Sequence, residues 1–249
     1  MLFTLLISLF AIPEKIDAAH TEIYNQLPEV EDADATIKQR PDFATFLTDF
    51  GSLVRGHGLE DTVGLRLIHK HFTLATTPEN QEVMCEDFAQ IDEADSLVTQ
   101  PQKLTEVRAK ASAASWLFSQ TEEEAGMPFE YSSDPAISQA RDRIDSATAF
   151  FKEARDMIVG SGYADLLSLA ILHRQKILST GQHHSFLEKS HLEGTLGKSV
   201  VQLVDNEQID ATDIRTAWGF GGVQTSFCVY AQFCQRVGQS GHVQVHAHV

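Results

Sequence analysis

Two histidines inside an apolar segment are the residues of this sequence best suited to chemistry. His69 and His71 belong to Thr62–Leu74 (TVGLRLIHKHFTL), a run rich in leucine and β-branched residues. If this run is extended, side chains alternate between its faces, so the two imidazoles share one face and lie roughly 6.5–7 Å apart. Imidazole nitrogens bind transition metals and exchange protons near neutral pH. The segment therefore predicts a strand that carries a metal site or a general acid/base.

A carboxylate near these histidines would complete a metal site. Glu82 directly precedes the expected strand Val83–Phe88. Two imidazoles and one carboxylate form a ligand set that Zn²⁺, Fe²⁺ or Cu²⁺ accepts. The expected metal ligands are thus His69, His71 and Glu82, and the expected cofactor is a divalent transition metal. The alternative is that both histidines are hydrogen-bonded at the edge of the core and bind nothing.

Two further groups of residues in the sequence could carry chemistry. His184, Glu188 and His191 would share one face of a helix, where they could bind a metal or simply be solvated. Cys85 could act as a nucleophile with His69 as its base. Phosphate-binding loops, dinucleotide fingerprints and serine-hydrolase motifs do not occur in the sequence. The motifs therefore name no specific reaction.

An internal repeat indicates how these residues are positioned. Residues on both sides of His69 recur 104 positions later, around His173. The identical pairs are Phe46/Phe150, Gly56/Gly160, Gly58/Gly162, Asp61/Asp165, Leu65/Leu169, His69/His173, Leu74/Leu178 and Thr76/Thr180. Such a spacing predicts a duplicated unit. Because His71 corresponds to Gln175, the two copies differ at the candidate site, and we expect His173 to face His69 and Glu82 as a third catalytic residue.

The repeat suggests an α+β fold of two similar halves, each a helix followed by a small, mainly antiparallel sheet. Residues 1–40 are expected to form an apolar segment and an acidic connector, residues 41–120 the first half, 121–133 a linker, and 134–249 the second half with its tail. Helices are expected over Pro41–Arg55 and, capped by Asp134, up to Val159. Two segments fit either a helix or a strand, although the repeat favours a strand for the second: Leu104–Gln120 and Ala164–Leu178. A strand is also expected over Ser226–Cys234.

Composition narrows the classes of partner. The chain has 249 residues, 43% hydrophobic and 22% charged, and a formal net charge of −16. This charge argues against a nucleic-acid partner, whose phosphates require clustered Lys and Arg. Met1–Ile12 is apolar but too short to span a bilayer, so no membrane span is expected. The expected location is cytoplasmic, or secreted if Met1–Ala18 is a signal peptide.

A resemblance rests on three short motifs. Gly64–Phe72 (GLRLIHKHF), the acidic Glu79 and Glu82, and the later Trp116-Leu-Phe118 resemble a group of functionally uncharacterised proteins of filamentous fungi. That group carries a Leu-Leu-His-Arg-His-Phe motif, then a glutamate, then a Trp-x-Phe segment, and Lys70 replaces its usual arginine. The resemblance implies no activity, but it supports His69, His71 and Glu82 as positions of interest.

Two function classes follow from the sequence. The first is an enzyme that acts on a small hydrophobic metabolite by metal-assisted or histidine general acid/base chemistry. The second is a non-catalytic protein that binds a small molecule or a protein partner and uses the histidines structurally. The sequence leaves the oligomeric state open.

Overall fold

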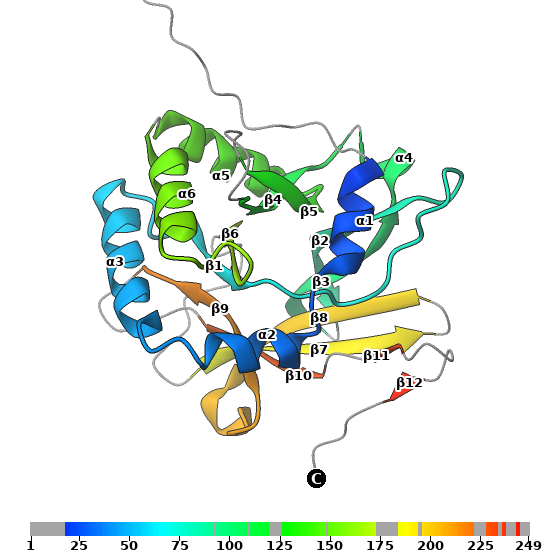
Figure 1. Ribbon diagram of the computed structural model, residues 1–249. Helices are drawn as coiled ribbons and strands as arrows, with labels where there is room; N and C mark the ends of the chain where they lie inside the picture. Colours follow the sequence, from blue (N-terminus) through cyan, green and yellow to red (C-terminus); the bar gives the residue numbers. More distant parts are fainter. Residues whose placement is uncertain are drawn as a thin grey trace, which may run out of the picture.

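A ten-stranded sheet closes on itself as a barrel in the computed structural model (Figure 1). The structure describes residues 18–91, 93–108, 110–119, 126–147, 149–172, 184–193, 196–221, 228–233, 236–237 and 243–244. The strands are β1 (Val63–Leu67), β2 (Glu82–Ile91), β3 (Ala94–Lys103), β4 (Ser112–Leu117), β5 (Met127–Ser132), β6 (Leu167–Ile171), β7 (His184–Glu193), β8 (Leu196–Asp205), β9 (Ile214–Gly219) and β10 (Cys228–Phe233). The short strands β11 (Arg236–Val237) and β12 (Val243–Gln244) pair separately.

Helices cover the barrel from outside (Figure 1). They are α1 (Ala18–Gln26), α2 (Val30–Ile37), α3 (Phe43–Gly56), α4 (Leu104–Val107), α5 (Pro135–Ser146) and α6 (Phe150–Gly160), with a 3₁₀ turn at Asn206–Gln208. Phe50 of α3 and Phe150 of α6 are fully buried in one apolar cluster with Leu65, Trp116 and Leu169 from the strands. Each such side chain contributes about 1.5–3 kcal/mol through burial, so this layer fixes β1, β4 and β6 against the helices.

Strand β1 separates an apolar exterior from a charged interior. Val63, Leu65 and Leu67 belong to the cluster that includes the helices, whereas Arg66, between them, pairs with carboxylates of β2 and β5. Alternation of side chains along a strand produces this division. The interior of the barrel is consequently the place where charged and titratable groups gather.

The first five strands and the next five occupy equivalent positions around the barrel. Neighbours around the barrel run β1-β6-β4-β5-β2-β3-β8-β7-β10-β9. Exchanging each of β1–β5 with the strand five places later in the chain leaves all neighbour relations unchanged. The pairs β2–β5 and β7–β10 are both parallel, and the antiparallel pairs β1–β6 and β3–β8 join the two sets. Each set of five strands follows a helix, α3 or α6.

The α+β class expected from the sequence is confirmed, and several elements lie where they were expected. Helix α3 and strands β2 and β10 fall in or near the segments assigned to them, and Asp134 caps α5 by accepting a hydrogen bond from the Ala136 amide at 2.8 Å. The segment 104–120 contains both expected forms, first α4 and then β4. Within the described residues, no helix is long and apolar enough to cross a bilayer.

Other elements differ from expectation. The single helix expected up to Val159 is two helices, because Ala147 leaves the helical region with φ −86° and ψ 67°. Part of the expected linker, Met127–Ser132, is the buried strand β5. Within the expected strand Thr62–Leu74, only Val63–Leu67 is β-structure.

Candidate metal centre

The two histidines lie in a loop that leaves the barrel after β1. Helix α1 holds this loop through three hydrogen bonds: the His71 amide donates to the Tyr24 hydroxyl at 3.0 Å, and the Asn25 side chain both accepts from and donates to the Leu74 backbone, at 2.8 and 2.9 Å. Tyr24 is fully buried. The loop is therefore fixed in place although it belongs to no strand.

The ring of His69 is held in one tautomer. Its Nδ1 lies 2.8 Å from the carbonyl oxygen of Leu67, and since a carbonyl only accepts, Nδ1 carries the proton. Nε2 then bears a lone pair, and it is buried without a hydrogen-bond partner among the described residues. Burial, followed by the neighbouring His71, lowers the pKa of His69 to about 4. A backbone-anchored imidazole with a free lone pair is the usual state of a metal ligand.

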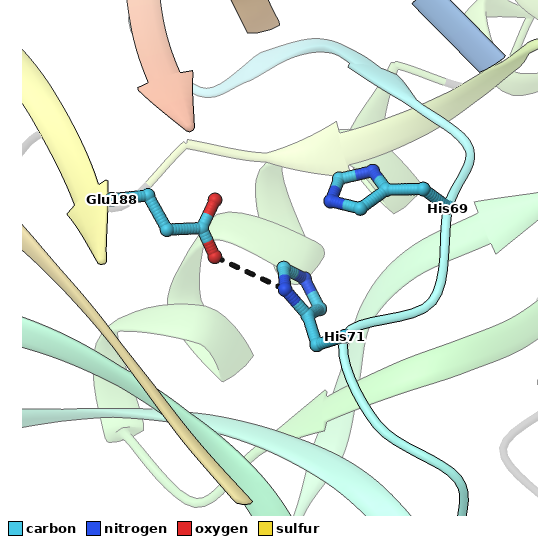
Figure 2. A group of neighbouring side chains, drawn as sticks. All are labelled: His69, His71 and Glu188. Carbon is cyan, nitrogen blue, oxygen red and sulfur yellow. Dashed lines mark ion pairs between the residues drawn. The ribbon is translucent and has the colours of Figure 1, made fainter. Parts of the chain in front are cut away.

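His71 and Glu188 face the same point as His69 (Figure 2). The His71 Nδ1 lies 3.2 Å from a Glu188 carboxylate oxygen and has no hydrogen-bond partner among the described residues. One donor atom from each of the three residues lies within 4.8 Å of the other two. With metal–ligand distances of about 2.0–2.2 Å, two ligands of one ion are separated by roughly 3.0–3.4 Å. The His71–Glu188 distance fits this range.

A second carboxylate lies behind His71. Glu130 accepts hydrogen bonds from Arg66 at 2.9 Å and Ser115 at 2.8 Å through one oxygen, while its other oxygen is 3.9 Å from the His71 Nε2. Arg66 also donates to Glu86 at 2.7 Å. Burial alone would lower the pKa of Arg66, but Glu86 and Glu130 outweigh it, and the pKa is raised. Glu130 is thus anchored with one oxygen facing His71.

These residues line a cavity in the barrel. The space open to water-sized molecules is about 40 Å³. Its polar wall comprises Arg66, His69, His71, Glu86, Glu130 and Glu188. The remaining wall is mainly apolar: Leu67, Leu97, Phe129, Leu172, Val201 and Ala217, with Thr99 and Thr216. The cavity is therefore lined by both charged and apolar side chains.

Of the expected site residues that the structure describes, only His69 and His71 lie together. His69 and His71 converge, with ring centroids 4.7 Å apart, whereas the Glu82 carboxylate accepts a hydrogen bond from the Ala75 amide at 2.9 Å and is not in the metal-ligand group. His173 lies outside the described residues. The carboxylate that lies with the two histidines is that of Glu188.

The structure differs from two other expectations, the helix that would carry Glu188 and the nucleophilic role of Cys85. The segment His184–Glu193 is strand β7, not a helix, so Glu188 faces the barrel interior. Cys85 belongs to the apolar cluster outside the barrel, and burial, followed by nearby carboxylates, raises the pKa of its thiol. A thiol in this environment is a poor nucleophile, and Cys85 does not line the cavity.

Glu188 could have been found in the sequence by its correspondence with Glu86. The two glutamates are on the corresponding strands β7 and β2, in corresponding hairpins: Glu86 is paired with Thr99 on β3, and Glu188 with Val201 on β8. Comparison of the chain with protein-family models, curated proteins and solved structures found no match.

Proposed function

We propose that the barrel interior binds a divalent transition metal through His69, His71 and Glu188, and that this metal acts on a small molecule bound beside it. The observation that carries the proposal is the convergence, at a buried place, of one carboxylate and two imidazole nitrogens that have no hydrogen-bond partner among the described residues. Unpartnered polar atoms in a buried place are costly, and a metal ion would satisfy all three donors together.

The charge of the cavity favours a dication. Among the described residues that line it, Glu86, Glu130 and Glu188 are acidic and Arg66 is the basic counterpart. Arg66 bonds to Glu86 and Glu130, and among these four described residues three carboxylates stand against one guanidinium group. Buried charge of one sign is strongly destabilising in a medium of low polarity. A bound dication would balance it.

The ligand set indicates the chemistry. Two imidazoles with one carboxylate suit Zn²⁺ or Fe²⁺, and three protein ligands leave coordination positions open for water or substrate. Such an ion can polarise a bound molecule as a Lewis acid. The apolar wall formed by Leu97, Phe129 and Val201 supports a small, largely apolar substrate. The function that the site supports best is therefore that of a metal-dependent enzyme acting on a small molecule.

Metal analysis of the purified full chain tests this proposal. After exposure to Zn²⁺ or Fe²⁺ and removal of excess metal, we expect about one tightly bound ion per chain. His69→Gln, His71→Gln and Glu188→Gln should each lose it while retaining the circular dichroism of the parent. His57→Gln is the matched control, since His57 lies at the surface, where it pairs with Glu153 at 3.0 Å. A parent protein that binds no ion, or site variants that keep it, would contradict the proposal.

A second candidate is a metal-free binding protein. The observation that favours it is the 3.2 Å separation of His71 and Glu188, which a protonated imidazole would convert into an ion pair. In that case the cavity would hold an organic ligand and the histidines would be structural. Unchanged metal content combined with lost stability in the His71→Gln variant would favour this alternative.

We also infer that the two sets of strands arose by duplication of one unit. The repeat at 104 residues and the exchangeable strand order support this inference. The proposed site is then shared, because His69 and His71 come from the first unit and Glu188 from the second. In the sequence repeat, Gln175 of the second unit corresponds to His71, and loss of such a histidine would leave a single working site.

A further inference from the structure

We propose that Glu130 is a positioning residue of the metal centre, which holds the ring of His71 so that Nδ1, and not Nε2, binds the ion. This inference rests on the proposed metal site and deepens it, because it names the nitrogen that each histidine offers and a residue that acts through His71. It is carried by the contacts on the two sides of the His71 ring.

The two ring nitrogens of His71 face different carboxylates. Nδ1 lies 3.2 Å from Oε1 of Glu188, the contact drawn in Figure 2, and Nε2 lies 3.9 Å from Oε1 of Glu130. All three residues are buried. A neutral imidazole carries its proton on one nitrogen and a lone pair on the other. The carboxylate that accepts the N–H therefore decides which nitrogen remains to bind an ion.

Glu130 is held in a position to accept the proton of Nε2. Its Oε2 accepts hydrogen bonds from Arg66 at 2.9 Å and from Ser115 at 2.8 Å, while its Oε1 faces His71. A metal-bound imidazole almost always donates its other N–H to a carboxylate, a carbonyl or a water. The 3.9 Å separation is about 1 Å longer than an N–H···O hydrogen bond, and we expect it to shorten when an ion binds Nδ1.

Arg66 disfavours the opposite arrangement. An ion on Nε2 of His71 would lie beside Glu130, whose carboxylate is bonded to the guanidinium group of Arg66. Arginine keeps its positive charge in proteins, and two cations close together in a buried place repel each other strongly. On the other side of the ring, Glu188 accepts its hydrogen bond from the uncharged hydroxyl of Ser199. The Nδ1 side is therefore the better place for a cation.

His69 follows the same rule with the opposite nitrogen. Its Nδ1 donates to the backbone carbonyl of Leu67 at 2.8 Å, which leaves Nε2 for the ion. The two histidines thus bind through different atoms, Nε2 of His69 and Nδ1 of His71, and each donates its other N–H to an anchored oxygen. This mixed pattern is a property that spectroscopy can measure.

Nuclear magnetic resonance of the parent protein tests the pattern directly. The full chain, labelled with ¹⁵N-histidine, is loaded with Zn²⁺ at about pH 8, where histidine rings are ordinarily neutral. Long-range ¹H–¹⁵N correlations show which nitrogen of each ring carries a proton and which binds the metal, and backbone resonances assign the rings. We expect His71 to be bound through Nδ1 and protonated on Nε2, and His69 the reverse. Binding of His71 through Nε2 would overturn the inference.

Glu130→Gln should weaken the site through His71. Because Arg66 and Ser115 both donate to Oε2, the single oxygen of glutamine takes that place and its NH₂ group faces Nε2 of His71. A donor then faces a donor. We expect Zn²⁺ affinity to fall about tenfold to a hundredfold, and the Nε2–H resonance to move from the downfield position of a carboxylate-bonded proton. If this variant folds poorly, the spectrum of the parent still decides the question.

Glu153→Gln is the matched control. Glu153 lies at the surface, where its carboxylate is 3.0 Å from Nε2 of His57, so this variant changes a histidine–glutamate contact outside the cavity. It should bind Zn²⁺ as the parent does. A Glu130→Gln variant that keeps the affinity of the parent would overturn the role of Glu130 and leave the proposed function intact. A parent chain that binds neither Zn²⁺ nor another ion would overturn both proposals.

Discussion

The Nδ1 atom of His71 lies 3.2 Å from a carboxylate oxygen of Glu188, although the two residues belong to different halves of the chain. The same carboxylate oxygen accepts a hydrogen bond from Ser199 at 2.5 Å. Glu188 is thereby oriented towards the histidines by its own hairpin, β7–β8. The arrangement that would allow Glu188 to bind the proposed metal also has a cost in stability, since it keeps a carboxylate buried near two other acidic residues.

Replacing Glu188 by glutamine should separate these two effects. We expect metal affinity to fall by roughly a hundredfold or more. Replacing a residue that only hydrogen-bonds to a metal ligand already lowers metal affinity by about tenfold to a hundredfold, and Glu188 is itself a proposed ligand. The metal-free variant should be as stable as the parent or more stable, by about 1 kcal/mol, because a buried charge is removed. Urea unfolding in the presence of a chelator and metal titration measure the two quantities. Retained metal affinity with reduced stability would refute the role assigned to Glu188.

The low pKa of His69 predicts a pH dependence of the metal-free protein. The pKa is about 4 in the folded chain, against an ordinary value of 6.5, because burial and then His71 disfavour the charged ring. The unfolded chain therefore binds more protons between these values, and folding stability decreases as the pH falls from about 6.5 to 4. The full loss is on the order of 3 kcal/mol. Urea unfolding of the parent and of His69→Gln across this range measures it, and equal slopes would contradict the prediction.

The sequence was sufficient to identify the helix α3, several strands and both histidines. The apolar residues at helical spacing in Pro41–Arg55 and the alternating apolar residues in Ser226–Cys234 are local patterns, which a single segment records. The capping role of Asp134 is similarly local. Because His69 and His71 are close in sequence, their convergence could also be anticipated from one short segment.

The partner carboxylate could not be anticipated in the same way. Glu188 approaches the histidines because β7 lies in the barrel wall, and this depends on pairing of strands distant in sequence. The local spacing of His184, Glu188 and His191 fits a helix, but pairing with β8 makes the segment a strand. Glu82 was nearer in sequence, yet its carboxylate bonds to the loop backbone at Ala75.

Tyr24 provides a test of whether helix α1 supports the histidine loop. Tyr24→Phe removes the hydroxyl that accepts the His71 amide hydrogen bond and leaves a buried donor unsatisfied. We expect a loss of about 1–3 kcal/mol in the free energy of unfolding. Metal affinity should fall as well, because the loop that carries two ligands is less restrained. Calorimetry with and without metal measures both effects, and an unchanged affinity would show that the loop is held by other contacts.

Gly64 provides a test of the closure of the barrel. A Cβ atom at this position would lie 2.4 Å from the backbone carbonyl oxygen of Trp218 and 2.8 Å from the Leu172 side chain. Because Gly64 is paired with Gly219, this contact is at the junction of β1 and β9 that closes the sheet. Gly64→Ala should therefore destabilise the chain by about 2 kcal/mol or more, since overpacking at a rigid backbone cannot be relieved by a rotamer change.

The matched control for Gly64 is Gly56, the last residue of α3. A Cβ at Gly56 would meet nothing within 4 Å, and alanine is a better helix former than glycine. Gly56→Ala should be neutral or stabilising, by up to about 1 kcal/mol. Thermal unfolding of the two variants side by side measures the difference. If Gly64→Ala were as stable as Gly56→Ala, the close contact between β1 and β9 would not exist, and the barrel would be open at the edge that leads into the histidine loop.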